Sequence, residues 1–280
     1  MKRFFLLAAF AALFGLMCGA PAASAQNAGL ETKGLSWTDI GKGAQVTYVQ
    51  ARIFNSTQSI SMIRFPQNRV RMRIVNDPGA EADSTGALAA RHGAIGAING
   101  SYFNMKNLTP VTFVKEKRRI EGTTTARETL RTDGLVAIRG RKVDIIRCDT
   151  LSCIEVTKNC PDALAAGPVL LLGGWEARDE WPAESFFTQR HPRTLVGTTR
   201  DGWVYFVVID GRAPGQADGA TIHEAAQIAR LIGLDDALNL DGGGSSALWT
   251  RAHGVVSYPC DNRRFDHAGQ RRVPNILIIR

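Results

Sequence analysis

The segment Asn239-Leu240-Asp241-Gly242-Gly243-Gly244-Ser245-Ser246 places one carboxylate, three consecutive glycines and two hydroxyls directly after a short apolar run. Consecutive glycines cost backbone entropy, so they are typical of places where another group approaches the backbone closely. Successive N–H groups in such a turn can bind an anion. Two interpretations have equal weight: a site for a phosphorylated or otherwise polar substrate, and an ordinary turn in which Asp241 bonds its own backbone.

A capped helix is predicted just upstream of this segment. Thr221 is a suitable N-cap residue, and Glu224 lies three positions later, as in a capping box. Apolar residues recur on one face of residues 222–232, and Gly233 is typical of a helix C-terminus. A short strand, residues 237–240, is expected to connect this helix to the glycines.

The rest of the chain predicts many strands and two or three helices, without regular alternation of the two. Residues 165–172 predict one buried strand, residues 56–61 a polar turn, and residues 106–131 a long surface excursion. Residues 194–198 and 203–209 predict antiparallel strands. The pattern indicates an α+β fold, in which a mixed, largely antiparallel sheet with a few packed helices forms a single catalytic domain.

The N-terminus has the features of a secretion signal. Lys2 and Arg3 precede an apolar stretch, residues 4–17, and Ala23-Ser24-Ala25 is a small-residue cleavage site. The apolar stretch is shorter than the roughly 20 residues that a transmembrane helix needs. We therefore predict a signal peptide over residues 1–25, an N-terminal arm over 26–40 and one domain over 41–280. A periplasmic or secreted location follows, without stable membrane insertion after cleavage.

The net charge of the chain is +8 at pH 7. Such a balance suits an anionic substrate, and it equally suits an ordinary solvated surface. The sequence contains no nucleic-acid-binding motif, so nucleic acid is not expected as a partner.

Four cysteines follow the predicted cleavage site: Cys148, Cys153, Cys160 and Cys260. An even number of cysteines in an oxidising compartment predicts two disulfides, for which three pairings exist. Cys148–Cys153 with Cys160–Cys260 is favoured, because a short loop closes easily and a long loop gains more stability from closure. The spacing does not match a zinc site.

Several segments together resemble the phosphodiester glycosidase family, which includes the enzyme that removes N-acetylglucosamine from a phosphodiester on mannose. The matching segments occur in family order from about residue 94 to the C-terminus: 97–103, 167–170, 191–197, 210–224 and 239–246. One departure is Ser101, which stands where the family's Asn-Gly-Gly-Phe-Phe element has its second glycine. The resemblance implies an α+β hydrolase that acts on a sugar-1-phosphodiester of the N-acetylglucosamine type, in envelope or exopolysaccharide glycans.

Three side chains are assigned catalytic roles on these grounds. Asp241 is the candidate nucleophile or general base, because glycosyl transfer to water uses carboxylates and a phosphate leaving group needs little acid assistance. Arg193 is the candidate phosphate partner, since a guanidinium can hold two oxygens together. Asn99 offers a donor and an acceptor to a sugar. Arg193 could instead pair with a surface carboxylate, and Asn99 could belong to an ordinary turn.

A second group is assigned to substrate binding: Gly100, Asp210, Glu224, Gly242, Gly243, Gly244 and Ser245. The glycine N–H groups are expected to cradle a phosphate oxygen. Asp210 could be a second carboxylate, a metal ligand or a turn residue, and Glu224 could serve only the capping box. No cofactor is expected. A divalent cation beside Asp210 and Asp241 is unsupported by ligand spacing, and no metal site is assigned.

Two other functions stay open from the sequence. A serine esterase could use Ser245 with Asp261 and His267, although alanine replaces the last glycine of the nucleophile elbow. A periplasmic factor that binds polysaccharide, or assists exopolysaccharide assembly, would keep the polar pocket without turnover. The combination of Asn99, Arg193 and Asp241 favours the glycosidase.

Overall fold

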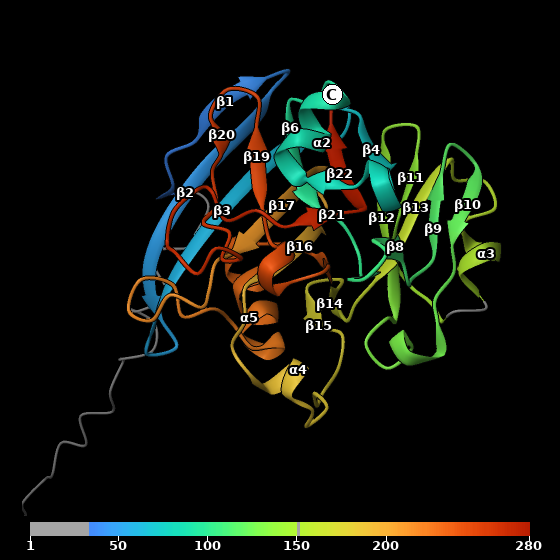
Figure 1. The fold of residues 1–280 in the computed structure, drawn as a ribbon. Helices are drawn as coiled ribbons and strands as arrows, with labels where there is room; N and C mark the ends of the chain where they lie inside the picture. Colours follow the sequence, from blue (N-terminus) through green and yellow to red (C-terminus); the bar gives the residue numbers. More distant parts are fainter. Residues whose placement is uncertain (1–33, 150–151) are drawn as a thin grey trace, which may run out of the picture.

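The computed structural model describes residues 34–149 and 152–280, which fold around three antiparallel sheets (Figure 1). The predicted signal peptide and residues 26–33 of the predicted arm lie outside the described residues. The first sheet has eight strands in the order β1 (Thr38–Gly41), β2 (Ala44–Ile53), β3 (Ser56–Pro66), β17 (Trp203–Ile209), β16 (Arg193–Thr198), β18 (Asp236–Asn239), β14 (Val169–Leu172) and β15 (Trp175–Glu176).

Two five-stranded sheets complete the framework. One has the order β10 (Arg119–Gly122), β9 (Val114–Glu116), β13 (Asp162–Ala166), β11 (Gly134–Arg139) and β12 (Lys142–Arg147). The other has the order β20 (Gly254–Val255), β19 (Leu248–Thr250), β6 (Gly96–Asn99), β22 (Asn275–Ile279) and β4 (Met72–Asn76). Two small ribbons pair β21 (Arg272–Val273) with β5 (Asp83–Ser84) and β7 (Phe103–Asn104) with β8 (Thr109–Pro110).

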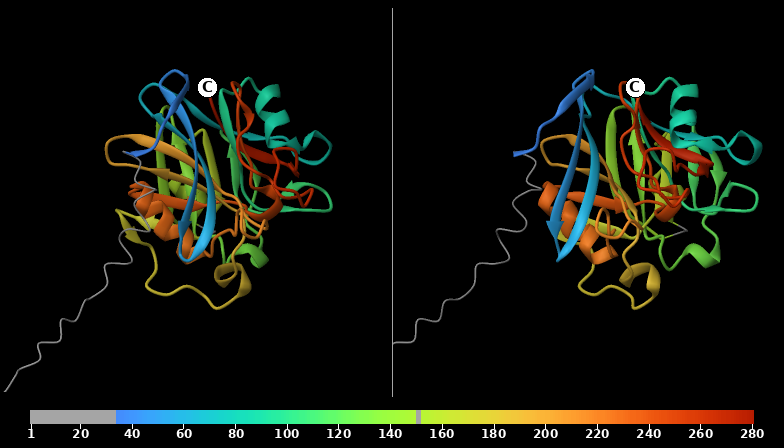
Figure 2. Two further views of the ribbon diagram at one scale, coloured as in Figure 1. Left: turned by 90° about the vertical axis from the view of Figure 1, so that its left-hand side faces the viewer. Right: turned by 60° about the vertical axis from the view of Figure 1, so that its left-hand side comes forward.

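One central core is shared by the inner faces of the three large sheets. Successive side chains of β17 point alternately to the two faces of the first sheet. Phe206 and its alternate neighbours pack into the central core with Ile98 and Leu164 of the other sheets. Tyr205 and Val207 point to the opposite face, which the helix α5 (Ile222–Ile232) covers. Figure 2 shows the sheets arranged around this interior.

Short helices cover the outer faces. Thr221 and Glu224 form both hydrogen bonds of the predicted capping box of α5, and Gly233 ends that helix with φ 91°. The helix α2 (Thr85–Arg91) packs on the third sheet. The remaining α-helices among the described residues are α3 (Ser152–Val156) and α4 (Ser185–Thr188). Among the described residues, no helix has the length and apolar character needed to span a bilayer.

The α+β class, the few packed helices and the largely antiparallel pairing are confirmed, but the predicted arrangement in one mixed sheet is wrong. The strands divide into separate sheets, and all pairs of named strands among the described residues are antiparallel. Residues 165–172 do not form one strand. Gly167 and Pro168 separate β13 of the second sheet from β14 of the first. Periodicity could not reveal this break, because both halves are buried.

Two local predictions also differ from the structure. Residues 56–61 begin the long strand β3, and the turn lies at Phe54 and Asn55, whose φ angles are both 53°. Two residues with positive φ suit the tight hairpin between β2 and β3. Within the predicted excursion, β9 joins the second sheet as an interior strand. Apolar pattern alone could not show either pairing.

The four cysteines are free thiols in this structure. The Sγ atoms of Cys148 and Cys153 lie 2.9 Å apart, so their pairing stays a prediction. The Cys160–Cys260 pairing is not supported. Cys160 packs with Phe113 in the cluster on the outer face of the second sheet, whereas Cys260 lies near Arg212 and the carbonyl of Gly243. The predicted pairing rested on loop length, which gives no information about where each cysteine lies in the fold.

Candidate active site

A polar cavity of about 290 Å³ opens at the glycine turn. Asp241 is the one carboxylate among its lining residues, and four arginines surround it. The cavity is lined by Arg131, Ser185, Phe186, His191, Arg193, Arg212, Asp241, Gly242, Gly243, Gly244 and Arg271. The predicted pair Asp241 and Arg193 therefore lies in one cavity.

Three adjacent strands of the first sheet deliver the central residues to one edge. β16 begins at Arg193, which pairs with Ile209 at the end of β17. β18 ends at Asn239, which pairs with Leu195 of β16. Because antiparallel neighbours exchange their ends, the start of β16 meets the ends of β17 and β18. Arg193, Arg212 and Asp241 thus gather at one edge, although they are distant in sequence.

The three glycines are under different local constraints. A Cβ on Gly242 would lie 2.6 Å from the Pro192 carbonyl oxygen, a backbone atom. Gly243 has φ +63° and begins a single 3-10 turn, η5 (Gly243–Ser245). A Cβ on Gly244 would lie 2.4 Å from Arg271 Nη2. The run of glycines therefore allows close approach of the chain on several sides.

The turn presents fewer amides to an anion than the sequence predicts. Gly242 N donates to Asp241 Oδ1 at 3.0 Å, and Gly243 N donates to the Pro192 carbonyl at 2.9 Å. Gly244 N makes no hydrogen bond to a described residue. The predicted three-amide cradle is therefore wrong for Gly242 and Gly243, and Gly244 N is the amide left for a ligand.

The environment of Asp241 raises the pKa of its carboxyl group to about 6. Burial is the largest cause, since desolvation disfavours the charged form. The neighbouring Ser245 hydroxyl, the charges of Arg131 and Arg271, and the hydrogen bond from Gly242 N oppose it and lower the pKa. The carboxylate form therefore predominates at neutral pH and is lost in mild acid.

Arg193 is only 2% exposed, and its guanidinium is held by backbone carbonyls. Its Nε donates to the Ala220 carbonyl at 2.8 Å, and its Nη2 donates to the carbonyls of Phe186 and Gln189. No hydrogen bond joins Nη1 to a described residue. Burial lowers the pKa of Arg193 to about 10, so the side chain stays charged at neutral pH. A buried cation with a free donor is a suitable anion-binding group.

The other three arginines enter the cavity from separate segments. Arg131 forms an ion pair with Glu128, and Arg271 forms one with Asp261. Arg212 is exposed, and its Nη1 lies 3.9 Å from Cys260 Sγ. Arg193 and Arg212, which have no ion pair with a described residue, leave the cavity with a positive field around one carboxylate.

The family model for phosphodiester glycosidase matches residues 92–280. The chain belongs to the phosphodiester glycosidase family. This match begins just before β6 and includes all the residues that line the cavity. No curated protein matches the chain significantly.

Solved structures of the same fold are distant in sequence. A hypothetical protein from Synechocystis has a TM-score of 0.70 and 16% identity, covering 88% of this chain and 63% of that one. The catalytic domain of zebrafish N-acetylglucosamine-1-phosphodiester alpha-N-acetylglucosaminidase, auto-inhibited by its pro-peptide, has a TM-score of 0.66 and 16% identity, with 84% and 82% covered. The "Putative exported protein" from Burkholderia pseudomallei K96243 has a TM-score of 0.62 and 16% identity, with 82% and 75% covered.

Asn99 and Gly100 lie behind the family's glycine turn, not in the cavity. Asn99 is fully buried, and its Oδ1 accepts from Thr194 Oγ1 and from Ala247 N. Its Nδ2 donates to the Asp241 carbonyl. The Gly100 carbonyl accepts from Asp241 N. The predicted contact of these residues with sugar is therefore wrong in this structure, because their polar groups already hold the Asp241 backbone.

Asp210 and Glu224 are not part of the cavity lining either. Asp210 is buried and accepts from Ser59 Oγ at 2.6 Å and from Tyr258 N at 2.8 Å, while burial raises its pKa to about 7. Glu224 caps α5 and pairs with Arg190. Their assignment to substrate binding is replaced by structural roles. The capping-box interpretation of Glu224 is confirmed.

The serine esterase alternative lacks its triad. Ser245 Oγ is buried beside the Asp241 carboxyl group, whose pKa the hydroxyl lowers. His267 Nδ1 instead contacts the Ser257 carbonyl at 2.8 Å, and Asp261 pairs with Arg271. The two residues proposed to activate Ser245 are therefore committed elsewhere. Ser245 remains a neighbour of the Asp241 carboxyl.

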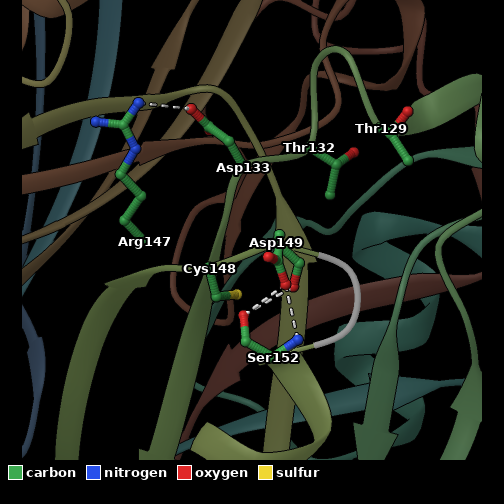
Figure 3. A pocket seen from close by; sticks show the side chains of 7 residues that line it. All are labelled: Thr129, Thr132, Asp133, Arg147, Cys148, Asp149 and Ser152. Atoms are coloured by element: carbon green, nitrogen blue, oxygen red, sulfur yellow. Dashed lines mark hydrogen bonds and ion pairs between the residues drawn. The ribbon is translucent and has the colours of Figure 1, made fainter.

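A larger cavity, of about 640 Å³, is lined by Thr129, Thr132, Asp133, Arg147, Cys148, Asp149 and Ser152 (Figure 3). Its charged side chains already have partners. Asp133 lies 3.9 Å from Arg147 and pairs with Arg178, and Asp149 accepts from Ser152. Among the described residues, no group of three or more His, Cys, Asp and Glu side chains is placed to hold a metal ion, in this cavity or elsewhere.

Sequence reasoning missed Arg131, Arg271 and the role of Arg212. Arg131 and Arg271 lie in segments that lack periodicity, and nothing in their surroundings distinguishes them from other basic residues. Arg212 had a signal, because it follows the strand-ending Asp210-Gly211 within a family-like segment. His191 also lines the cavity, and burial with the charges of Arg193 and Arg212 lowers its pKa.

Proposed function

We propose that this protein is an exported glycosidase that hydrolyses a sugar-1-phosphodiester of the N-acetylglucosamine type in envelope or exopolysaccharide glycans. The observation that carries the proposal is the single carboxylate, Asp241, placed among four arginines in one cavity. A phosphodiester leaving group is anionic and departs readily, so such a site needs cations more than a second, acidic carboxyl group.

In this mechanism, Arg193 Nη1 and Gly244 N donate to phosphate oxygens. The negative charge that grows on the leaving phosphate is then stabilised by donors already in place. Asp241 acts on the sugar side, either by attacking the anomeric carbon or by accepting a proton from the attacking water. Asn99 and Gly100 position Asp241 through its backbone.

The test is release of N-acetylglucosamine from UDP-N-acetylglucosamine by the purified protein and by its Asp241→Asn variant. We expect the variant to lose at least about 100-fold in kcat, since an amide neither attacks nor accepts the proton. Asp218→Asn is a suitable control, because Asp218 accepts from Thr57 N outside the cavity.

Equal turnover by the wild-type and Asp241→Asn proteins would refute the role of Asp241. Binding of the sugar phosphodiester without any turnover by the wild-type protein would instead favour the polysaccharide-binding alternative.

A further inference from the structure

The four arginines of the cavity form two pairs held by different walls. Arg131 and Arg193 lie over the Phe186 ring, with guanidinium carbons 5.3 and 5.2 Å from its centroid. Arg212 and Arg271 instead pack against the glycine turn. A Cβ on Gly243 would lie 3.0 Å from Arg212 Nη2, and one on Gly244 would lie 2.4 Å from Arg271 Nη2.

The two pairs have the same charge composition. One arginine in each pair is neutralised by a carboxylate: Arg131 by Glu128 and Arg271 by Asp261. The other arginine, Arg193 or Arg212, has no ion pair with any described residue. Each wall therefore offers one uncompensated guanidinium to a ligand.

Asp241 lies under the influence of both pairs, because Arg131 and Arg271 both lower the pKa of its carboxyl group. A phosphodiester carries one negative charge and two non-bridging oxygens. The aromatic-wall pair, Arg131 and Arg193, has enough donors for those two oxygens. In the glycine-turn pair, Arg212 and Arg271, Arg212 is then left without an anionic partner, while Arg271 keeps its ion pair with Asp261.

We infer that Arg212 and Arg271 form a subsite for a second anionic group of the substrate. This inference rests on the proposed function and narrows the substrate class to sugar phosphodiesters with two separate negative groups. The second group is either the next phosphate of a diphosphate or the carboxylate of an acidic sugar. The tetrahedral phosphate and the planar carboxylate each have a pair of oxygens that a guanidinium can hold through two hydrogen bonds.

The test compares three ligands by titration calorimetry in the Asp241→Asn background, where no turnover is expected. The methyl diester of N-acetylglucosamine 1-phosphate carries one negative charge. UDP-N-acetylglucosamine adds a second phosphate, and the methyl diester of glucuronic acid 1-phosphate adds a carboxylate. We expect one of the two doubly charged ligands to bind at least about tenfold more tightly than the singly charged diester. A gain of that size corresponds to one additional charge-assisted hydrogen-bonded pair.

Substitution Arg212→Met should remove most of that gain. Arg118→Met is a matched control, because Arg118 is also exposed, with φ 71° against 62° for Arg212, and lies outside the cavity. A gain for UDP-N-acetylglucosamine alone would identify a diphosphate, and a gain for the glucuronate alone an acidic sugar.

Two results would overturn the inference while leaving the proposed function intact. The singly charged diester could bind as tightly as both doubly charged ligands, or the gain could persist in Arg212→Met. Failure of all three ligands to bind would instead contradict the proposed function, and the subsite with it.

Discussion

Asn99 Nδ2 donates to the Asp241 carbonyl oxygen at 2.7 Å, across 142 residues of sequence. The same side chain accepts from Thr194 Oγ1 at 2.8 Å and Ala247 N at 3.1 Å. One buried amide thus connects β6, β16 and the segment that follows the glycine turn. It positions the backbone of the proposed nucleophile from behind, without reaching the cavity.

Substitution Asn99→Ala should lower both stability and kcat. It leaves Ala247 N and the Asp241 carbonyl without their partner, which costs about 2–4 kcal/mol of unfolding free energy. In the folded fraction, kcat should fall more than KM rises, because the arginines stay in place while the carboxylate is held less firmly. Urea unfolding and steady-state kinetics measure the two effects, with exposed Asn68→Ala as control. An unchanged kcat would show that the positioning role is wrong.

Activity should depend on the ionisation of Asp241. Because burial raises its pKa to about 6, the reactive carboxylate is lost as the pH falls through that value. We expect kcat/KM to fall about tenfold per pH unit below 6, since protonation removes the nucleophile or base. Asp210→Asn should retain this profile, because Asp210 does not line the cavity. If kcat/KM instead fell below about pH 7, and this fall disappeared in Asp210→Asn, the titrating group would be Asp210 and the prediction for Asp241 would be wrong.

Asp210 should control stability instead. Burial raises its pKa from 3.8 to about 7, so the folded protein binds this proton more tightly than the unfolded chain does. Its contribution is present below about pH 4 and is lost as the pH rises through 7. The fall in unfolding free energy between pH 5 and pH 8 should be smaller in Asp210→Asn by about 2–4 kcal/mol. Equal pH dependence in both proteins would contradict this assignment.

Gly242 and Gly244 should respond differently to alanine. In Gly242→Ala, the new Cβ meets the Pro192 carbonyl oxygen, and the backbone must shift at a cost of about 1–3 kcal/mol. In Gly244→Ala, it meets the side-chain ends of Arg271 and Asp261. Those flexible ends can move, so stability should stay closer to wild type while KM rises.

Thermal unfolding and kinetics distinguish the two outcomes. Gly34→Ala is the control, since nothing lies within 4 Å of its Cβ position. A stable, fully active Gly242→Ala protein would contradict the close approach at that position.

The sequence predicted the parts of the site that are contiguous or depend on local rules. Asp241 and its glycines stand together, and Arg193 begins a strand that alternation had located. The capping box of α5 followed from Thr221 and Glu224. In each case, the determining interactions lie within a few residues of one another.

The remaining features depend on long-range burial and pairing. Asn99 and Asp210 have side chains suited to binding, but each is fully used by partners from distant strands. Arg131 and Arg271 reach the cavity only because the second and third sheets bring their segments to the edge of the first. One amino-acid sequence gives no information on these contacts, since it does not show which polar groups already have hydrogen-bond partners in the fold.

The backbone contacts of the glycine turn have a practical consequence for the whole chain. The turn is held by Gly100, Pro192 and Asn99, and its cavity is completed by Arg131 and Arg271. These residues span nearly the entire family domain, so no shorter fragment contains a complete site. Turnover would therefore report on the integrity of the entire fold, and a truncated or nicked chain should lose activity well before it loses its secondary structure.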